Sequence, residues 1–180
     1  MPEIEIRPAT ATDIPVLARL DHSYTSEYAW QMDVQSDGGQ IGAVFHEIRL
    51  PRSVRVDYPR SPLALEADWQ TRSGLLVARL NDEVVGYSSL AANLTPLTTW
   101  MTDLVVTPRL RRKGIGTALL FAAQEWVQGH SLSRRLILEM QLKNYPAIQL
   151  AQKLGFDFSG YNDHYFANRD IAIFFAKYLR

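Results

Sequence analysis

The stretch from Val105 to Thr117 constrains the fold more than any other, because it joins a strand to a helix through a basic turn that contains glycine. Its residues VVTPRLRRKGIGT leave an apolar segment at a proline, gather four cations without an acid, and then begin an amphipathic helix. N–H groups in the first turn of a helix are unpaired and carry the positive end of its dipole, and glycines let a ligand approach closely. The stretch therefore predicts a phosphate-binding turn. A capped helix with a solvated basic first turn is the alternative.

Two other phosphate-binding loops fit this turn less well. The Walker loop requires Gly-x-x-x-x-Gly-Lys-Ser/Thr, which the chain lacks. The dinucleotide fingerprint requires a third glycine where this chain has Leu119.

The apolar spacing along the chain predicts strands that alternate with a few helices. Strands are expected at 4–7, 30–34, 40–48, 75–80, 84–91, 98–106, 135–140, 156–166 and 171–179, and helices at 14–20, 63–71, 114–128 and 146–154. This order indicates an α/β (α+β) chain with a mixed, twisted sheet and helices on its faces. At 180 residues, the chain is expected to form one domain over residues 1–180.

Charge and cysteine content limit the function classes. With 19 basic and 19 acidic residues the net charge is zero, which argues against a dedicated nucleic-acid-binding protein. The sequence contains no cysteine, so disulfides, thiolate metal sites and a cysteine nucleophile are excluded. The four histidines lack metal-ligand spacing, and no metal is expected. No signal peptide and no apolar run of the ~18 residues that a membrane span needs are present, so no membrane partner and a cytoplasmic location are expected.

The zero net charge is divided unevenly along the chain. Residues 1–103 contain 14 acidic and 8 basic side chains, whereas residues 104–180 contain 5 acidic and 11 basic ones. The division suggests two surfaces with different ligands, with chance as the alternative.

Residues around the basic turn and downstream of it carry a family resemblance. Arg111, Gly114 and Gly116 fit the pattern Gln/Arg-x-x-Gly-x-Gly/Ala, and a helix with the pattern N-x-x-A-x-x-L-x-x-x-L-G-F runs from Asn144 to Phe156. In this order and spacing they resemble the GNAT superfamily of acyl-CoA-dependent N-acyltransferases. The tail, with YFAN at 165–168 and FFAKYL at 174–179, resembles the streptothricin acetyltransferase branch of that family.

This resemblance implies a fold and a co-substrate. The fold is a mixed, mostly antiparallel twisted sheet of about seven strands, flanked by helices and splayed at the central strands. The co-substrate is acetyl-CoA. Its pantetheine arm would pair with the backbone of the third central strand, and its pyrophosphate would meet backbone N–H groups and arginines of the turn, with an asparagine beside the arm. The positions implied are Leu104, Val105, Val106, Arg111, Arg112, Lys113, Gly114, Ile115, Gly116, Thr117 and Asn144. Asn144 is also a natural cap for the helix that follows it.

The sequence also offers candidates for the catalytic residues. Glu139, at the end of an apolar strand, is a candidate base that acts through water, and burial would raise its pKa; an ordinary strand-end carboxylate is the alternative. Many family members place a tyrosine acid where this chain has Ala151. Tyr165 is the first substitute considered and Tyr161 the second, and a reaction without a general acid is the third option.

The resemblance also suggests where an acceptor would bind. Tyr28 and Trp30 fall in the segment that usually shapes the acceptor pocket, and an aromatic wall suits a cation. Asp103 could face the amine or pair with an arginine. The predicted function is N-acetylation of a primary amine on a small cationic molecule. A non-catalytic acyl-CoA-binding module and a protein N-terminal or lysine acetyltransferase are the alternatives, and a homodimer is left open.

Overall fold

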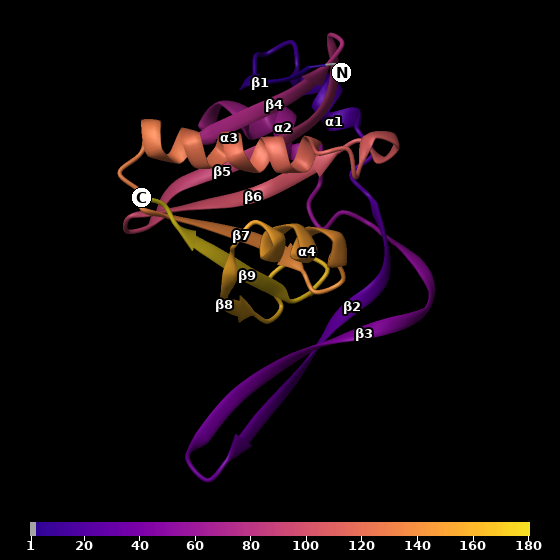
Figure 1. Ribbon diagram of the computed structural model, residues 1–180, viewed down its shortest axis with the longest axis vertical. Coiled ribbons are helices and arrows are strands. Elements are labelled where there is room, and N and C mark those ends of the chain that lie inside the picture. The colour runs from indigo at the N-terminus through magenta and orange to yellow at the C-terminus, as the bar shows by residue number, and fades with distance from the viewer. Residues whose placement is uncertain (1–2) are drawn as a thin grey trace.

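A seven-stranded sheet forms the centre of the computed structural model, which describes residues 3–180 (Figure 1). The strand order is β1-β4-β5-β6-β7-β9-β8, and all neighbours are antiparallel except β6 and β7. The strands are β1 (Ile4–Pro8), β4 (Gly74–Leu80), β5 (Glu83–Thr95), β6 (Thr98–Val106), β7 (Arg135–Gln141), β8 (Asp157–Asn162) and β9 (Ala172–Tyr178). This arrangement confirms the expected mixed, mostly antiparallel sheet.

Helices cover both faces of the sheet. They are α1 (Ile14–Arg19), α2 (Ala64–Asp68), α3 (Ile115–His130) and α4 (Tyr145–Lys153), with 3-10 turns at Trp69–Thr71 and Pro108–Leu110. On one face, Leu17 of α1 and Leu65 of α2 pack with Val77 and Tyr87 of the sheet. On the other face, the apolar side of α3 packs in the larger core with residues of α4, such as Ile148. No helix within residues 3–180 is long and apolar enough to cross a membrane.

The central strands separate along their length, as expected for a splayed sheet. β6 and β7 pair in parallel only over Thr98–Met101 and Arg135–Leu138. Beyond these pairs β6 continues to Val106 and β7 to Gln141, and the two strands diverge (Figure 1). Within residues 3–180, no strand pairs with the β7-facing backbone edge of β6 over its last five residues.

A β-bulge in β6 lies where the strands separate. Ser89 of β5 pairs with Asp103 and Leu90 pairs with Met101, which leaves Thr102 as an extra residue on β6. A bulge of this kind puts two residues opposite one and locally re-aims side chains. As a result, Met101 packs in the core beneath α3, whereas Asp103 lies on the opposite face.

The ribbon of β2 (Tyr24–Asp37) and β3 (Gln40–Val56) extends well away from the seven-stranded sheet (Figure 1). The sequence predicted a much shorter hairpin at 30–34 and 40–48. Most of β3 is exposed on both faces, so its polar and charged residues give little of the alternation by which a half-buried strand is detected.

The last predicted hairpin needs one correction. β8 ends at Asn162, so the expected strand at 156–166 is wrong beyond that residue. Residues after 162 form a turn in which the backbone N–H groups of Tyr165 and Phe166 donate to the Asp170 carbonyl oxygen, at 3.2 and 3.3 Å. Tyr165 therefore projects from a turn and not from a strand.

Candidate active site

The start of α3 leaves several backbone donors open. Gly114 precedes the helix with a φ of +86°, a left-handed conformation that favours glycine. The first helical hydrogen bond runs from Ala118 N to Gly114 O at 2.9 Å, so the N–H groups from Gly114 to Thr117 precede the helical ladder. A side chain added at Gly114 would enter open space. These features suit an anion such as a pyrophosphate.

The basic side chains of the turn differ in what they contact. Arg112 and Lys113 are exposed beside the helix start, where their charges add to that of the helix dipole. Arg111 instead turns back, and its Nε donates to Val106 O at 2.8 Å. The Arg111 guanidinium thus lies at the end of β6 and satisfies the carbonyl oxygen of Val106 there.

The open edge of β6 lies against a narrow cavity of about 50 Å³ between the splayed strands. Leu104 and Asn144 line it, as does Ala151, the position at which the family's tyrosine is missing. Val105 does not line it, because Val105 pairs with Tyr87 of β5 and its side chain is buried on the other face of the sheet. Asn144 Oδ1 accepts from Ala147 N at 3.2 Å, so the asparagine caps α4 and lines the cavity at once.

Glu139 lies on β7 just beyond the last residue that pairs with β6. Its side chain is only 1% exposed. Tyr165 donates its hydroxyl hydrogen to Glu139 Oε2 at 2.5 Å, and Arg60 forms an ion pair with Oε1. Burial raises the pKa of the Glu139 carboxyl, although Arg60 and Tyr165 oppose the rise. The structure thus brings together the two residues predicted as catalytic, Glu139 and Tyr165.

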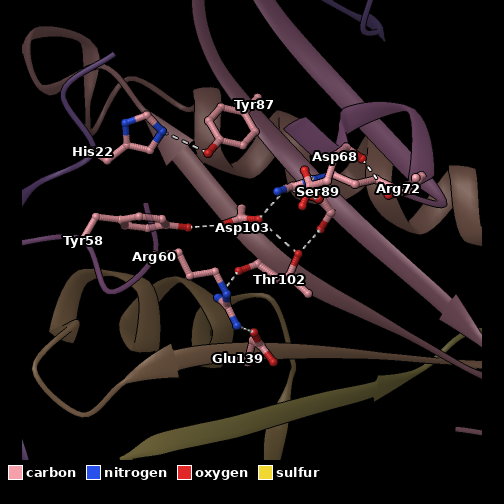
Figure 2. A network of polar contacts seen from close by, with 11 residues as sticks. His22, Tyr58, Arg60, Asp68, Arg72, Tyr87, Ser89, Thr102, Asp103 and Glu139 are labelled. Atoms are coloured by element: carbon pink, nitrogen blue, oxygen red, sulfur yellow. Dashed lines mark hydrogen bonds and ion pairs between the residues drawn. The ribbon is translucent and has the colours of Figure 1, made fainter. Parts of the chain in front are cut away.

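Asp103 forms a second carboxylate centre on the same side of the sheet (Figure 2). It accepts hydrogen bonds from the Tyr58 hydroxyl, from Arg72 Nη1 at 3.0 Å and from Thr102 Oγ1 at 3.1 Å. Arg72 also donates to Asp68 Oδ1 at 2.9 Å. Asp103 was expected either to face the amine or to pair with an arginine, and the structure shows the pairing with an arginine.

A cavity of about 640 Å³ lies beside Asp103. Asp103, Arg72, Arg60 and Tyr165 line it together with apolar side chains such as Leu90. Its volume falls in the range of small-molecule sites. Arg60 and Tyr165 connect it to Glu139, so a molecule in this cavity would lie next to the split between β6 and β7.

Tyr28 and Trp30 lie away from both cavities. Tyr28 stacks on Tyr145 at the start of α4, with ring centroids 4.9 Å apart. Trp30 N donates to Leu142 O at 3.0 Å, and its ring packs against the core. Their roles as acceptor contacts therefore stay a prediction. Both residues lie at the base of the ribbon.

Sequence reasoning missed three residues of the site, namely Tyr58, Arg60 and Arg72. They come from the segments that follow β3 and α2, where the sequence has no periodic pattern. The one available signal was Arg60 between Pro59 and Ser61-Pro62, a rigid segment that holds a long cation in place. Within residues 3–180 no group of three or more His, Asp or Glu side chains is arranged to hold a metal.

An unpaired strand edge that leads to an open helix start, with a buried carboxylate where the edge begins, defines a class of protein that can hold an extended phosphorylated ligand beside a proton acceptor. Comparison with known proteins identifies the class further. Residues 42–156 match the Acetyltransferase (GNAT) family, and the chain belongs to this family. It is an acetyltransferase.

Two curated relatives have different acceptors in their names. An N-alpha-acetyltransferase of Sulfurisphaera tokodaii is 33% identical over 117 residues, which cover 59% of this chain and 70% of that protein. A streptothricin acetyltransferase of Streptomyces lavendulae is 26% identical over 160 residues, which cover 87% of this chain and 82% of that protein.

Solved structures share the fold at low identity. A nourseothricin acetyltransferase superposes with a TM-score of 0.84 at 20% identity, over 98% of this chain and 99% of that one. A GNAT family acetyltransferase from Elizabethkingia anophelis with acetyl-CoA bound gives 0.66 at 19% identity, over 98% of each chain.

Proposed function

We propose that residues 1–180 form one domain that transfers an acetyl group from acetyl-CoA to a primary amine of a small cationic molecule. The observation that carries the proposal is the position of Glu139, a buried carboxylate that lines the narrow cavity where β6 and β7 part and contacts Arg60 and Tyr165 of the 640 Å³ cavity. The likeness to a streptothricin acetyltransferase over 87% of the chain supports a small-molecule acceptor.

The residues around the split fit the co-substrate. The N–H groups from Gly114 to Thr117, with Arg112 and Lys113 beside them, would hold the pyrophosphate. The open edge of β6 from Leu104 to Val106 would orient the pantetheine arm, with Asn144 alongside. When bound, acetyl-CoA supplies a thioester whose carbonyl carbon is attacked by the amine.

Glu139 acts as the proton acceptor in this proposal. An amine with a pKa near ~10.4 is protonated at neutral pH, so it must release one proton to solvent before it can attack, and it gives up a second proton to Glu139 as the C–N bond forms. A carboxylate whose pKa is raised by burial accepts that proton more readily than an exposed one.

Tyr165 is the proton donor to the departing sulfur. Burial, with the neighbouring Glu139 carboxylate, raises its pKa to about 12, so it stays protonated over the working pH range and gives its proton to the sulfur only as Glu139 replaces it. Glu139, once protonated, returns a proton to the Tyr165 oxygen across the 2.5 Å hydrogen bond.

A panel of acceptors tests the proposed reaction. Release of free CoA from acetyl-CoA is measured with nourseothricin (a mixture of streptothricins), with a polyamine and with a set of peptides that have free N-termini. Turnover of nourseothricin or the polyamine supports the proposal. Turnover of peptides alone supports the second candidate, a protein N-terminal acetyltransferase, which the 33% identity to the N-alpha-acetyltransferase favours.

Gly114→Val tests the placement of the co-substrate. We expect it to weaken acetyl-CoA binding about tenfold or more, since a branched side chain is strained at a φ of +86° and would project into the open space at the helix start. Isothermal titration calorimetry measures the Kd. Gly129→Ala, near the other end of α3, is the matched control and is expected to leave the Kd unchanged. Equal affinities in the two variants would contradict the placement.

Tyr165→Phe tests the proton donor. We expect kcat to fall about 100-fold, since a positioned general acid contributes about that much or more. The acidic limb of the pH profile should also move to higher pH, because Glu139 loses a hydrogen bond that lowers its pKa. Steady-state kinetics from pH 5 to 9 measures both effects. Tyr178→Phe, on the exposed end of β9, should behave like the wild type. An unchanged kcat in Tyr165→Phe would show that Tyr165 is not the proton donor.

A further inference from the structure

Arg60 lies at the point where the central sheet splits, and its side chain connects the two strands that part there (Figure 2). We propose that Arg60 is a positioning residue for the transfer reaction, which bridges β6 and β7 and holds Glu139 oriented and ionised. The proposal rests on the proposed function of Glu139 as the base.

The bridge occupies the first position beyond the paired part of the strands. The last pair between β6 and β7 is Met101 with Leu138, so the next residues on the two strands are Thr102 and Glu139. Arg60 Nη1 donates to Thr102 O at 2.8 Å, and Nη2 forms an ion pair with Glu139 Oε1. The guanidinium therefore satisfies a carbonyl at the point where strand pairing has ended.

A second segment holds the other oxygen of Glu139. The Tyr165 hydroxyl donates to Oε2, while the neighbouring ring of Phe166 lies under the Arg60 guanidinium at 5.1 Å from its centroid. The carboxylate is thus fixed at both oxygens by residues from two segments that are remote in sequence. A planar guanidinium contacts the two strands through separate nitrogens in a fixed geometry. A lysine would have to reach both acceptors from its single ammonium nitrogen.

The charged and titratable groups that face Glu139 are Arg60, Tyr165 and Asp103. Burial and the negative charge of Asp103 raise the pKa of the Glu139 carboxyl, whereas Arg60 and Tyr165 lower it. Arg60 supplies the cation in this set, so its loss leaves a buried carboxylate with one neutral donor. The proton would then stay on Glu139 to higher pH, so at any given pH a smaller share of the enzyme would hold the ionised base.

The test follows the titration of Glu139 directly, by the ¹³C chemical shift of its side-chain carboxyl, assigned by comparison with Glu139→Gln. In Arg60→Gln the midpoint should move up by about one to three pH units relative to the wild type. Arg60→Lys keeps the charge and should move it less. Arg79→Gln removes an arginine whose partners Glu5 and Asp82 are exposed and which lines neither cavity, and it should leave the Glu139 midpoint near its wild-type value.

Kinetics provide a second readout for the same variants. The deficit of Arg60→Gln in kcat/KM should be largest at the acidic end of the profile and shrink as the pH rises and Glu139 ionises. The proposal would be overturned if Glu139 titrated with the same midpoint in Arg60→Gln and in the wild type. It would also be overturned if the loss of kcat/KM in Arg60→Gln did not change with pH. Failure of the proposed function is distinguishable, because it would appear as full activity in Glu139→Gln whatever the titration shows.

Discussion

Replacing Glu139 with glutamine is expected to lower kcat/KM by about 100- to 10,000-fold, the contribution typical of a positioned general base. Glutamine keeps the size of the side chain and a hydrogen-bonding oxygen for Arg60, but it cannot accept the proton of the amine. Because Glu139 is not among the groups proposed to hold the pyrophosphate or the pantetheine arm, the affinity for acetyl-CoA should change little. Steady-state kinetics and calorimetry measure the two quantities.

The pH dependence of the remaining activity gives a sharper comparison. The acidic limb of the wild-type profile, which reports ionisation of Glu139 above the ordinary pKa of a glutamate, should be absent from Glu139→Gln. Glu125→Gln, on the exposed side of α3, is the control carboxylate and should keep both the rate and the limb. Wild-type activity in Glu139→Gln would remove Glu139 from the chemistry.

Arg72→Met is expected to lower the free energy of unfolding by about 3–5 kcal/mol, as found when one partner of a buried ion pair is removed. Arg72 is 16% exposed and Asp103 is 4% exposed, so the remaining carboxylate would be a buried charge with no guanidinium beside it. The Tyr58 and Thr102 hydroxyls remain as donors, but neither carries a positive charge. Urea denaturation monitored by circular dichroism measures the change.

Arg79→Met is the matched comparison for this loss. Its partners Glu5 and Asp82 are 55% and 94% exposed, so the change should cost less than about 1 kcal/mol. Should the two variants lose similar stability, the pair of Arg72 with Asp103 would be no stronger than a surface contact. In the double variant Arg72→Met with Asp103→Leu, much of the loss should be recovered, because the buried charge is gone.

The parts of the site that depend on local sequence could be predicted. The basic turn and Gly114 at the start of α3 follow from residues that are neighbours in the chain, and the N-cap role of Asn144 is of the same kind. Glu139 was a candidate because it ends an apolar strand. The resemblance supplied the split of the sheet between β6 and β7, which spacing alone does not contain.

Contacts between distant segments could not be predicted in the same way. Arg60 meets Glu139 across 79 residues, and Tyr58 meets Asp103 across 45, so no spacing rule connects either pair. Tyr165 was expected to lie near the site from a strand, yet it reaches Glu139 from a turn. The ribbon was underestimated because strands that are solvated on both faces lack the alternation that marks a core.

Because Thr102 is an extra residue on β6, the alternation of side chains between the two faces of the strand reverses at this point. In the half of the strand before it, an odd-numbered residue such as Met101 faces α3, whereas in the half after it the even-numbered Leu104 and Val106 do. Deletion of one residue after Thr102 would exchange the two faces of the strand end, and would turn an apolar side chain toward the cavity that Asp103 lines. Point substitutions on β6 are therefore local in effect, while a change of length on this strand would alter both sides of the sheet at once.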